Sequence, residues 1–246
     1  INPKTIINCA AYTAVDEAES NPEIAFRINA DAVGEMSDWC AKAGATFVHF
    51  STDYVFDGHK LHHYTEEDTP NPLSVYGKSK RCGEEKFLES GCRGLCLRTS
   101  WLHSAHGKNF FLTMMRLLNT KRDIQVVNDQ IGVPTTTTFL AELTLELLNG
   151  QNGEQLDGTI LHACPSGHAT WYDFAVYIQQ WMRRTGIPII CQKITPISSN
   201  QFMQKAPRPR LSALSNSLVT SKLPAFDLQW QMATNNISLE DSLWNR

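Results

Sequence analysis

Residues 46–51 read TFVHFS, and similar short runs occur at residues 5–10 (TIINCA) and 94–99 (GLCLRT). Each run is largely apolar without the strict alternation of a half-exposed strand, which is typical of a parallel strand buried on both faces. Residues 16–43 and 75–88 lie between the runs and have helical composition, with a break expected at Asn21-Pro22 and a stop at Gly44. Strands that alternate with helices predict βαβ units and a parallel sheet.

The same alternation continues beyond residue 100 and then becomes less regular. Helices are predicted at residues 110–118 and 139–148, and strands at 124–127 and 159–162. We therefore divide the chain into a nucleotide-binding domain at residues 1–150 and a smaller, mainly substrate-binding portion at residues 151–246. Part of residues 100–120 is expected on the substrate side.

Composition excludes several classes of protein. The net charge of the 246 residues is −3 and the basic side chains are scattered, so we expect no nucleic-acid partner. No apolar run approaches the ~20 residues of a membrane helix, and the first residues do not resemble a signal peptide, so we expect no membrane association and a cytoplasmic location. The 7 cysteines include no Cys-x-x-Cys pair, which predicts reduced thiols without a zinc site.

Chemistry is predicted where strands end, because open α/β sheets bind ligands there. Tyr76 and Lys80 are four residues apart at the start of a predicted helix, so their side chains share one face. A nearby ammonium favours the phenolate of a tyrosine and lowers its pKa. Such a pair can pass a proton to a carbonyl oxygen as hydride reaches the carbon, and Thr52, at the end of a neighbouring strand, can hold that carbonyl.

Three segments carry a resemblance to a known family. Residues 10–16 (AAYTAVD), 51–58 (STDYVFDG) and 76–80 (YGKSK) resemble the extended short-chain dehydrogenase/reductase family, and in particular its reductases of dTDP-linked keto-sugars. Residues 98–101 (RTSW), 171–175 (WYDFA) and Arg208-Pro209 with Ser212 extend the resemblance over nearly the whole chain. It implies an α/β fold with a Rossmann-like, doubly wound parallel sheet and a smaller C-terminal substrate-binding portion.

The resemblance also implies roles for individual residues. Tyr76 would be the general acid, Lys80 would tune it and bond the nicotinamide ribose, and Thr52 would orient the carbonyl. The residues implied to line the cofactor cleft, besides Tyr76 and Lys80, are Ala10, Ala11, Tyr12 and Thr13. Those implied to face the sugar nucleotide are Val15, Thr52, Asp53, Tyr54 and Trp101.

The implied reaction reduces the C4 ketone of dTDP-4-dehydro-L-rhamnose to give dTDP-L-rhamnose, a precursor of bacterial surface polysaccharides. NADPH or NADH would be the cofactor, and the substrate a dTDP-sugar. Magnesium and a homodimer occur among such reductases, but the sequence places no metal ligands. Two other functions stay open: a non-catalytic subunit resembling the β subunit of methionine adenosyltransferase, and a sugar-nucleotide epimerase or dehydratase with the same catalytic residues.

One element of the family pattern is missing. The family begins with a strand, a glycine-rich turn and a helix whose N-terminus receives the cofactor pyrophosphate. No Gly-x-Gly-x-x-Gly occurs in the 246 residues, so we expect an N-terminally incomplete sheet that lacks a unit of at least ~30 residues. The chain is then either a fragment of a longer protein or a truncated product with an incomplete site. The residue that distinguishes NADPH from NADH would lie in the missing unit.

Overall fold

The computed structural model describes residues 2–150 and 158–237. Its main element is a four-stranded parallel sheet in the order β1-β2-β3-β8. The first two strands are aligned so that Asn8 lies opposite His49. The bounds of the strands are β1 Thr5–Asn8, β2 Thr46–Thr52, β3 Gly94–Thr99 and β8 Thr159–His162.

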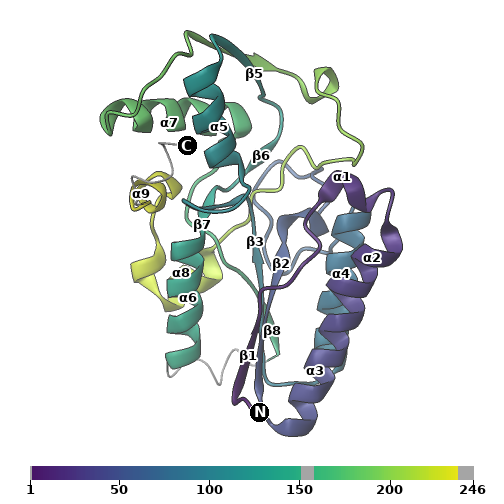
Figure 1. Cartoon of the computed structure of the whole chain (residues 1–246). Coiled ribbons are helices and arrows are strands. Elements are labelled where there is room, and N and C mark those ends of the chain that lie inside the picture. The colour runs from purple at the N-terminus through teal and green to yellow at the C-terminus, as the bar shows by residue number, and fades with distance from the viewer. Residues whose placement is uncertain (1, 151–157, 238–246) are drawn as a thin grey trace.

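Helices cover one face of the sheet through a buried apolar cluster. Phe47 of β2 and Cys96 of β3 pack there against Val33, Cys40 and Phe87 of the helices. Figure 1 shows this helical layer running along the sheet. Its elements are α1 (Val15–Ala18), α2 (Pro22–Phe26), a π-helical turn (Arg27–Asp31), α3 (Ala32–Ala43) and α4 (Val75–Glu89).

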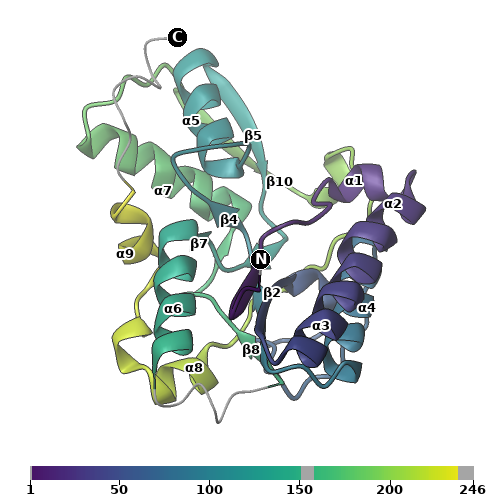
Figure 2. The same ribbon diagram turned by 60° about the horizontal axis from the view of Figure 1, so that its bottom comes forward.

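The opposite face is covered by α6 (Thr137–Asn149) and α8 (Ser217–Lys222). Val48 and Leu97 of the sheet are buried there against Leu140 and Leu143 of α6. Figure 2 shows α6 and α8 on one side of the strands and α3 and α4 on the other. Because successive side chains of a strand point to opposite faces, Phe47 and Val48 join different clusters, and the run that contains them is apolar throughout.

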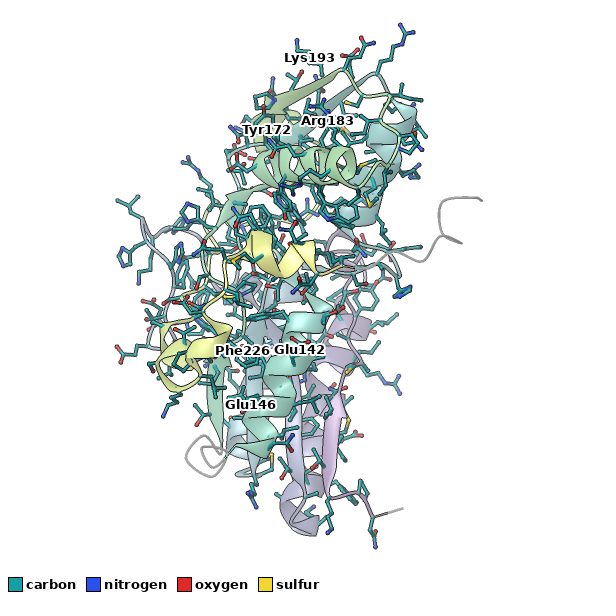
Figure 3. The ribbon with its side chains drawn as sticks, turned by 90° about the vertical axis from the view of Figure 1, so that its left-hand side faces the viewer. Glu142, Glu146, Tyr172, Arg183, Lys193 and Phe226 are labelled. Carbon is teal, nitrogen blue, oxygen red and sulfur yellow. The ribbon has the colours of Figure 1, made fainter. Side chains whose placement is uncertain are left out.

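A second portion of the fold is built around another strand pair. β5 (Asp123–Val127) pairs in parallel with β10 (Lys193–Ile197), separately from the main sheet. The helices α5 (Phe110–Thr120), α7 (Trp171–Arg184) and α9 (Trp230–Asn235) supply buried side chains to the core of this portion. Figure 3 shows Tyr172, Arg183 and Lys193 of this portion at one end of the molecule, and Glu142 and Glu146 of α6 nearer the other.

Short elements complete the description. Two-residue strands form the pairs β4–β7 and β6–β9, and β8 of the main sheet lies later in the chain than α5 and β5, so the chain crosses between the portions more than once. In the described part of the chain, no helix has the length and apolarity that a bilayer crossing requires. The remaining bounds are β4 Leu102–His103, β6 Ile131–Gly132, β7 Thr135–Thr136 and β9 Ala169–Thr170, with 3-10 turns at Asp53–Val55, Ser199–Gln201 and Pro224–Phe226.

The predicted parallel α/β sheet is confirmed. The strands predicted near residues 5–10, 46–51, 94–99 and 159–162 form it, and the expected helices between them are present. The expectation that the first of these strands is buried on both faces is wrong, because β1 lies at the edge of the sheet, where Ile7 is 42% exposed. The strand predicted at 124–127 also exists, but it lies outside the main sheet because it pairs with β10. Among the described residues, all seven cysteines are free, as expected, and Cys9 is exposed.

Candidate active site

Tyr76 and Thr52 meet where β2 ends and α4 begins. The helix starts at Val75 because the Ser74 hydroxyl accepts a hydrogen bond from the Gly77 amide at 3.1 Å, which caps the first turn. Tyr76 thus lies in that turn, and its phenol lies close enough to Thr52 for that side chain to act on its pKa. The two hydroxyls form one polar pair at the end of a parallel strand, as the sequence predicts.

The Tyr76 phenol is in its neutral form. Burial raises its pKa to about 12, the Asp53 carboxylate acts in the same direction, and Thr52 opposes both. The expectation from sequence was a pKa lowered by the Lys80 ammonium. Burial raises the pKa of Tyr76 instead, so at neutral pH the phenol holds the proton that a general acid must donate.

Lys80 lies one helical turn after Tyr76, and its side chain runs inward to β2. Its exposed fraction is 2%, and its ammonium donates a hydrogen bond to the carbonyl oxygen of Phe50. Nζ also lies 3.2 Å from Nε2 of His49. Burial lowers the pKa of Lys80 to about 8, while Cys96 and Glu84 favour its charged form. The amine therefore titrates close to physiological pH.

Gly77, between these two residues, allows the helix to approach the strand end. A Cβ atom at this position would lie 2.2 Å from the backbone oxygen of Tyr54, which no side chain tolerates. The rings of Tyr54 and Tyr76 consequently meet edge to face with their centroids 5.9 Å apart. The position of the Tyr76 hydroxyl is thus set by backbone packing as well as by its own rotamer.

Asp53 is buried next to Thr52 and connects the site to a distant part of the chain. Its carboxylate accepts hydrogen bonds from the hydroxyls of Thr52 and Ser212. Burial raises the pKa of Asp53 to about 7, and the bonds from Ser212 and Thr52 work against that rise. In the structure this carboxylate therefore orients the Thr52 hydroxyl by accepting its hydrogen bond. A direct contact between Asp53 and substrate stays a prediction.

An apolar cavity of about 380 Å³ opens beside Tyr54. Val15 and Tyr54, both predicted to face the substrate, line it together with Trp171. Trp101 lies behind Trp171, with the two ring planes 4° from parallel and their centroids 3.4 Å apart. Gly132 makes this stack possible, because a Cβ atom there would lie 2.4 Å from the Trp101 ring.

Arg208 is the cation at this cavity, and sequence reasoning gave it no role in the site. Its guanidinium forms an ion pair with Asp16 of α1 at 3.0 Å, and it opposes the rise that burial causes in the pKa of Tyr54. The Asp16 carboxylate also accepts hydrogen bonds from the amides of Lys205 and Ala206, and its pKa is lowered although partial burial opposes this. These contacts hold the segment around residue 206 against α1.

The predicted cofactor loop follows β1 and is held by Asn29. Ala10, Ala11 and Thr13 are exposed and Tyr12 is half-buried. The fully buried Asn29 side chain accepts a hydrogen bond from the Tyr12 amide at 2.8 Å and donates one to the Tyr12 carbonyl at 3.0 Å. Sequence reasoning missed Asn29, although an asparagine among the apolar residues of a predicted helix is a signal for such a role.

The donor set here suits the nicotinamide end of a dinucleotide. The exposed loop 10–13 follows β1 and the Tyr76 phenol lies at the end of β2, while the Lys80 amine is buried against β2 from the same helix as Tyr76. A ribose offers hydroxyls to the Tyr76 phenol and to the backbone of the loop. The residues therefore fit that half of the cofactor. A glycine-rich turn for the pyrophosphate is not among the motifs of the 246 residues.

Comparisons with known proteins agree with this geometry. The family model described as "RmlD substrate binding domain" matches residues 1–241. A dTDP-4-dehydrorhamnose reductase from Escherichia coli (strain K12) is 35% identical over 237 residues, which are 96% of this chain and 79% of that protein. The chain belongs to the dTDP-4-dehydrorhamnose reductase family. It is thus a member of an oxidoreductase family with a short-chain dehydrogenase/reductase fold.

Solved structures of dTDP-4-dehydrorhamnose reductases superpose closely on the chain. The protein from Clostridium acetobutylicum gives a TM-score of 0.85 at 36% identity, with 95% of this chain and 79% of that one covered. The protein from Bacillus anthracis, which was solved in complex with NADP, gives 0.85 at 32% identity, with 96% and 80% covered. The Rossmann-like fold that the sequence motifs implied is therefore confirmed.

Proposed function

We propose that this chain reduces the C4 ketone of dTDP-4-dehydro-L-rhamnose to the alcohol of dTDP-L-rhamnose, with NADPH rather than NADH as the reductant. The observation that carries the proposal is the buried, neutral Tyr76 phenol next to Thr52 at the end of a parallel strand. The names of the relatives support the substrate, and the NADP in the Bacillus anthracis structure supports the cofactor.

The chain's own residues provide the proton and the orientation. Tyr76 and Thr52 would both donate to the ketone oxygen, with the Thr52 hydroxyl rotating from the Asp53 carboxylate to the substrate, and this fixes the carbonyl for attack. NADPH, when bound, supplies the hydride. Tyr76 transfers its proton to the oxygen, so that ketone, NADPH and one proton give alcohol and NADP⁺. The Lys80 ammonium, on the same face of α4, stabilises the phenolate that remains until solvent returns the proton.

The cavity beside Tyr54 is the proposed site of the nucleotide. Its apolar wall, which includes Phe110 and Met114 of α5, suits a thymine and a deoxyribose, and Arg208 suits the diphosphate. Val15 and Tyr54 would then contact the sugar nucleotide directly, and Trp101 would shape the cavity through its stack on Trp171. Asp53 would act on the substrate through Thr52.

The test is NADPH oxidation in the presence of dTDP-4-dehydro-L-rhamnose. Tyr76→Phe should lower turnover by about 10²–10⁴-fold, the usual contribution of a general acid, while leaving binding of the sugar nucleotide intact. Tyr172→Phe makes the same change on α7, in the second portion of the fold, and should leave turnover unchanged. Equal activity of Tyr76→Phe and the unaltered chain would contradict the assignment.

The assay is run on the 246-residue chain and on a fusion in which a strand–glycine-rich turn–helix unit precedes it. Activity in the fusion alone would support the reductase and assign pyrophosphate binding to the added unit. Folded but inactive protein in both arms would favour a non-catalytic subunit. Conversion of the sugar without net NADPH oxidation would favour an epimerase or dehydratase.

The proposal also bears on the oligomeric state and on magnesium. A homodimer fits this proposal, and size-exclusion chromatography with light scattering tests it. Magnesium has no part in the proposal, since within residues 2–150 and 158–237 no three His, Cys, Asp or Glu side chains lie close enough to hold a metal ion.

A further inference from the structure

His49 lies in the middle of β2, between the Lys80 amine and the end of β1. Its side chain is fully buried, with Nε2 3.2 Å from Nζ of Lys80 and Nδ1 3.3 Å from Nδ2 of Asn8. The contact with Asn8 follows from the register of the sheet, because Asn8 is the direct partner of His49 on the neighbouring strand. A continuous chain of polar groups thus runs from Asn8 through His49 to Lys80.

The orientation of the Asn8 amide determines which nitrogen of His49 carries the proton. Oδ1 of Asn8 accepts a hydrogen bond from the Ala10 amide at 3.0 Å, so the NH₂ group must be the part that faces His49. That NH₂ donates to Nδ1, which is therefore unprotonated. Burial and the neighbouring Lys80 hold the pKa of His49 well below its usual value, so the ring is neutral and its single N–H is on Nε2.

This tautomer acts on the charge of Lys80. The Nε2–H group points at Nζ and can donate only to an amine that has a free electron pair, which an ammonium lacks. His49 therefore favours the neutral amine, in the same direction as burial. Two other ionisable groups face Nζ and favour the ammonium: Glu84 on α4, which is already paired with Arg98, and the Cys96 thiol on β3.

We propose that Asn8 and His49 are positioning residues that lock the imidazole as the Nε2–H tautomer and thereby set the proton affinity of Lys80. The inference rests on the proposed role of Lys80 beside Tyr76. Lys80 is useful to the reaction as an ammonium, so its titration sets the alkaline limit of turnover. The Asn8–His49 pair would then place that limit at a lower pH than an isolated lysine would give.

Asn8→Asp is the decisive substitution, because it keeps the shape and reverses the hydrogen bond. A carboxylate still accepts from the Ala10 amide but can only accept from His49, so the ring proton must move to Nδ1. Nε2 then accepts a hydrogen bond from the Lys80 ammonium. We expect the pKa of Lys80 to rise by about one pH unit, the effect of roughly one charge-assisted hydrogen bond.

The negative charge that Asn8→Asp introduces would also raise this pKa, so the same change is made with the imidazole removed. His49→Phe keeps a buried ring beside Phe47, with which His49 is stacked at 6.3 Å between centroids. In the His49→Phe background only the charge of the carboxylate acts on Lys80, and the shift should be clearly smaller. An equal shift in both backgrounds would overturn the proposal.

The readouts need no substrate. Nitrogen-15 NMR of histidine-labelled protein reports the tautomer of His49, and the ¹³Cε resonance of Lys80, assigned by its loss in Lys80→Met, reports the titration. We expect Nε2–H in the unaltered chain and Nδ1–H in Asn8→Asp. A ring protonated on Nδ1 in the unaltered chain would refute the lock even if His49→Phe failed to fold.

Turnover as a function of pH is measured in parallel on the same proteins. A shift of the alkaline limb that matches the NMR titration would support the link to catalysis. A tautomer and titration as expected, without NADPH oxidation by either the 246-residue chain or its fusion, would leave the tautomer assignment standing and refute the proposed function. Turnover whose alkaline limb does not shift with the pKa of Lys80 would refute the link between Lys80 and catalysis.

Discussion

Glu84 offers a strong test of how α4 is held against the sheet. Its side chain is fully buried and accepts hydrogen bonds from Nε and Nη2 of Arg98 at 2.8 and 2.7 Å. Ser51 donates to it at 2.6 Å and Arg81 at 3.0 Å. Arg98 itself is only 2% exposed, so its guanidinium relies on this one carboxylate for direct neutralisation.

Glu84→Gln keeps the size of the side chain and removes its charge. The amide retains one acceptor oxygen, but its NH₂ group must face donors, and the Arg98 charge stays buried without a partner. Breaking a buried ion pair in this way costs about 3–5 kcal/mol. We therefore expect the free energy of unfolding to fall by that amount, measured by urea denaturation at neutral pH with fluorescence and circular dichroism as coincident probes.

Glu85→Gln is the matched control. Glu85 is the next residue on the same helix and also pairs with Arg81, at 3.0 Å, but its side chain is 48% exposed. An exposed pair of this kind contributes about 0–1 kcal/mol. Similar losses of unfolding free energy in the two variants would contradict the reasoning, because burial of the Glu84 ion pair would then make no difference to stability.

Three further predictions concern the site. Asn29→Ala should raise the KM for NADPH and speed hydrogen exchange at the Tyr12 amide, which loses its acceptor; unchanged exchange would contradict the role of Asn29. Asp53 binds a proton up to a pH of about 7 in the folded chain but only to about 3.8 when unfolded, so its contribution to stability declines as pH rises between these values. Asp53→Asn should flatten that part of a curve of melting temperature against pH. Gly77→Ala should cost about 1–3 kcal/mol and lower turnover, because its Cβ meets a backbone carbonyl, whereas Gly34→Ala meets only a flexible lysine side chain at 3.1 Å and should be tolerated.

The sequence predicted the elements of the main sheet well, and their partners less well. β2 and β3 are buried on both faces along most of their length, and β8 is buried in its second half, so their runs are apolar and easy to recognise. β5 was recognised too, but no local pattern could show that it leaves the sheet to pair with β10. β10 itself was missed, because it contains Pro196 and alternates weakly between exposed and half-buried positions. The domain boundary at residue 150 stays a prediction.

In the candidate site, too, the sequence predicted individual residues better than the pairings between them. Tyr76, Lys80 and Thr52 were predicted because their spacing and their place at element ends are visible in the sequence; the structure places Tyr76 next to Thr52, and the catalytic roles of all three stay predictions. The bond between Asp53 and Ser212 joins residues 159 positions apart, and that between Asn8 and His49 joins residues 41 apart. Pairings at such separations depend on sheet register and helix docking, which residue types alone do not reveal. The substrate and cofactor contacts of the other predicted residues stay predictions.

The clamp of Asn29 on Tyr12 also bears on the thermodynamics of cofactor binding. Both polar backbone groups of Tyr12 are engaged before any ligand arrives, so this part of the loop loses its conformational freedom during folding. A preorganised loop adds little entropic cost when a dinucleotide binds against it. Calorimetry should therefore find a less unfavourable entropy of NADPH binding in the unaltered protein than in Asn29→Ala, a difference that a structure of either complex would not display.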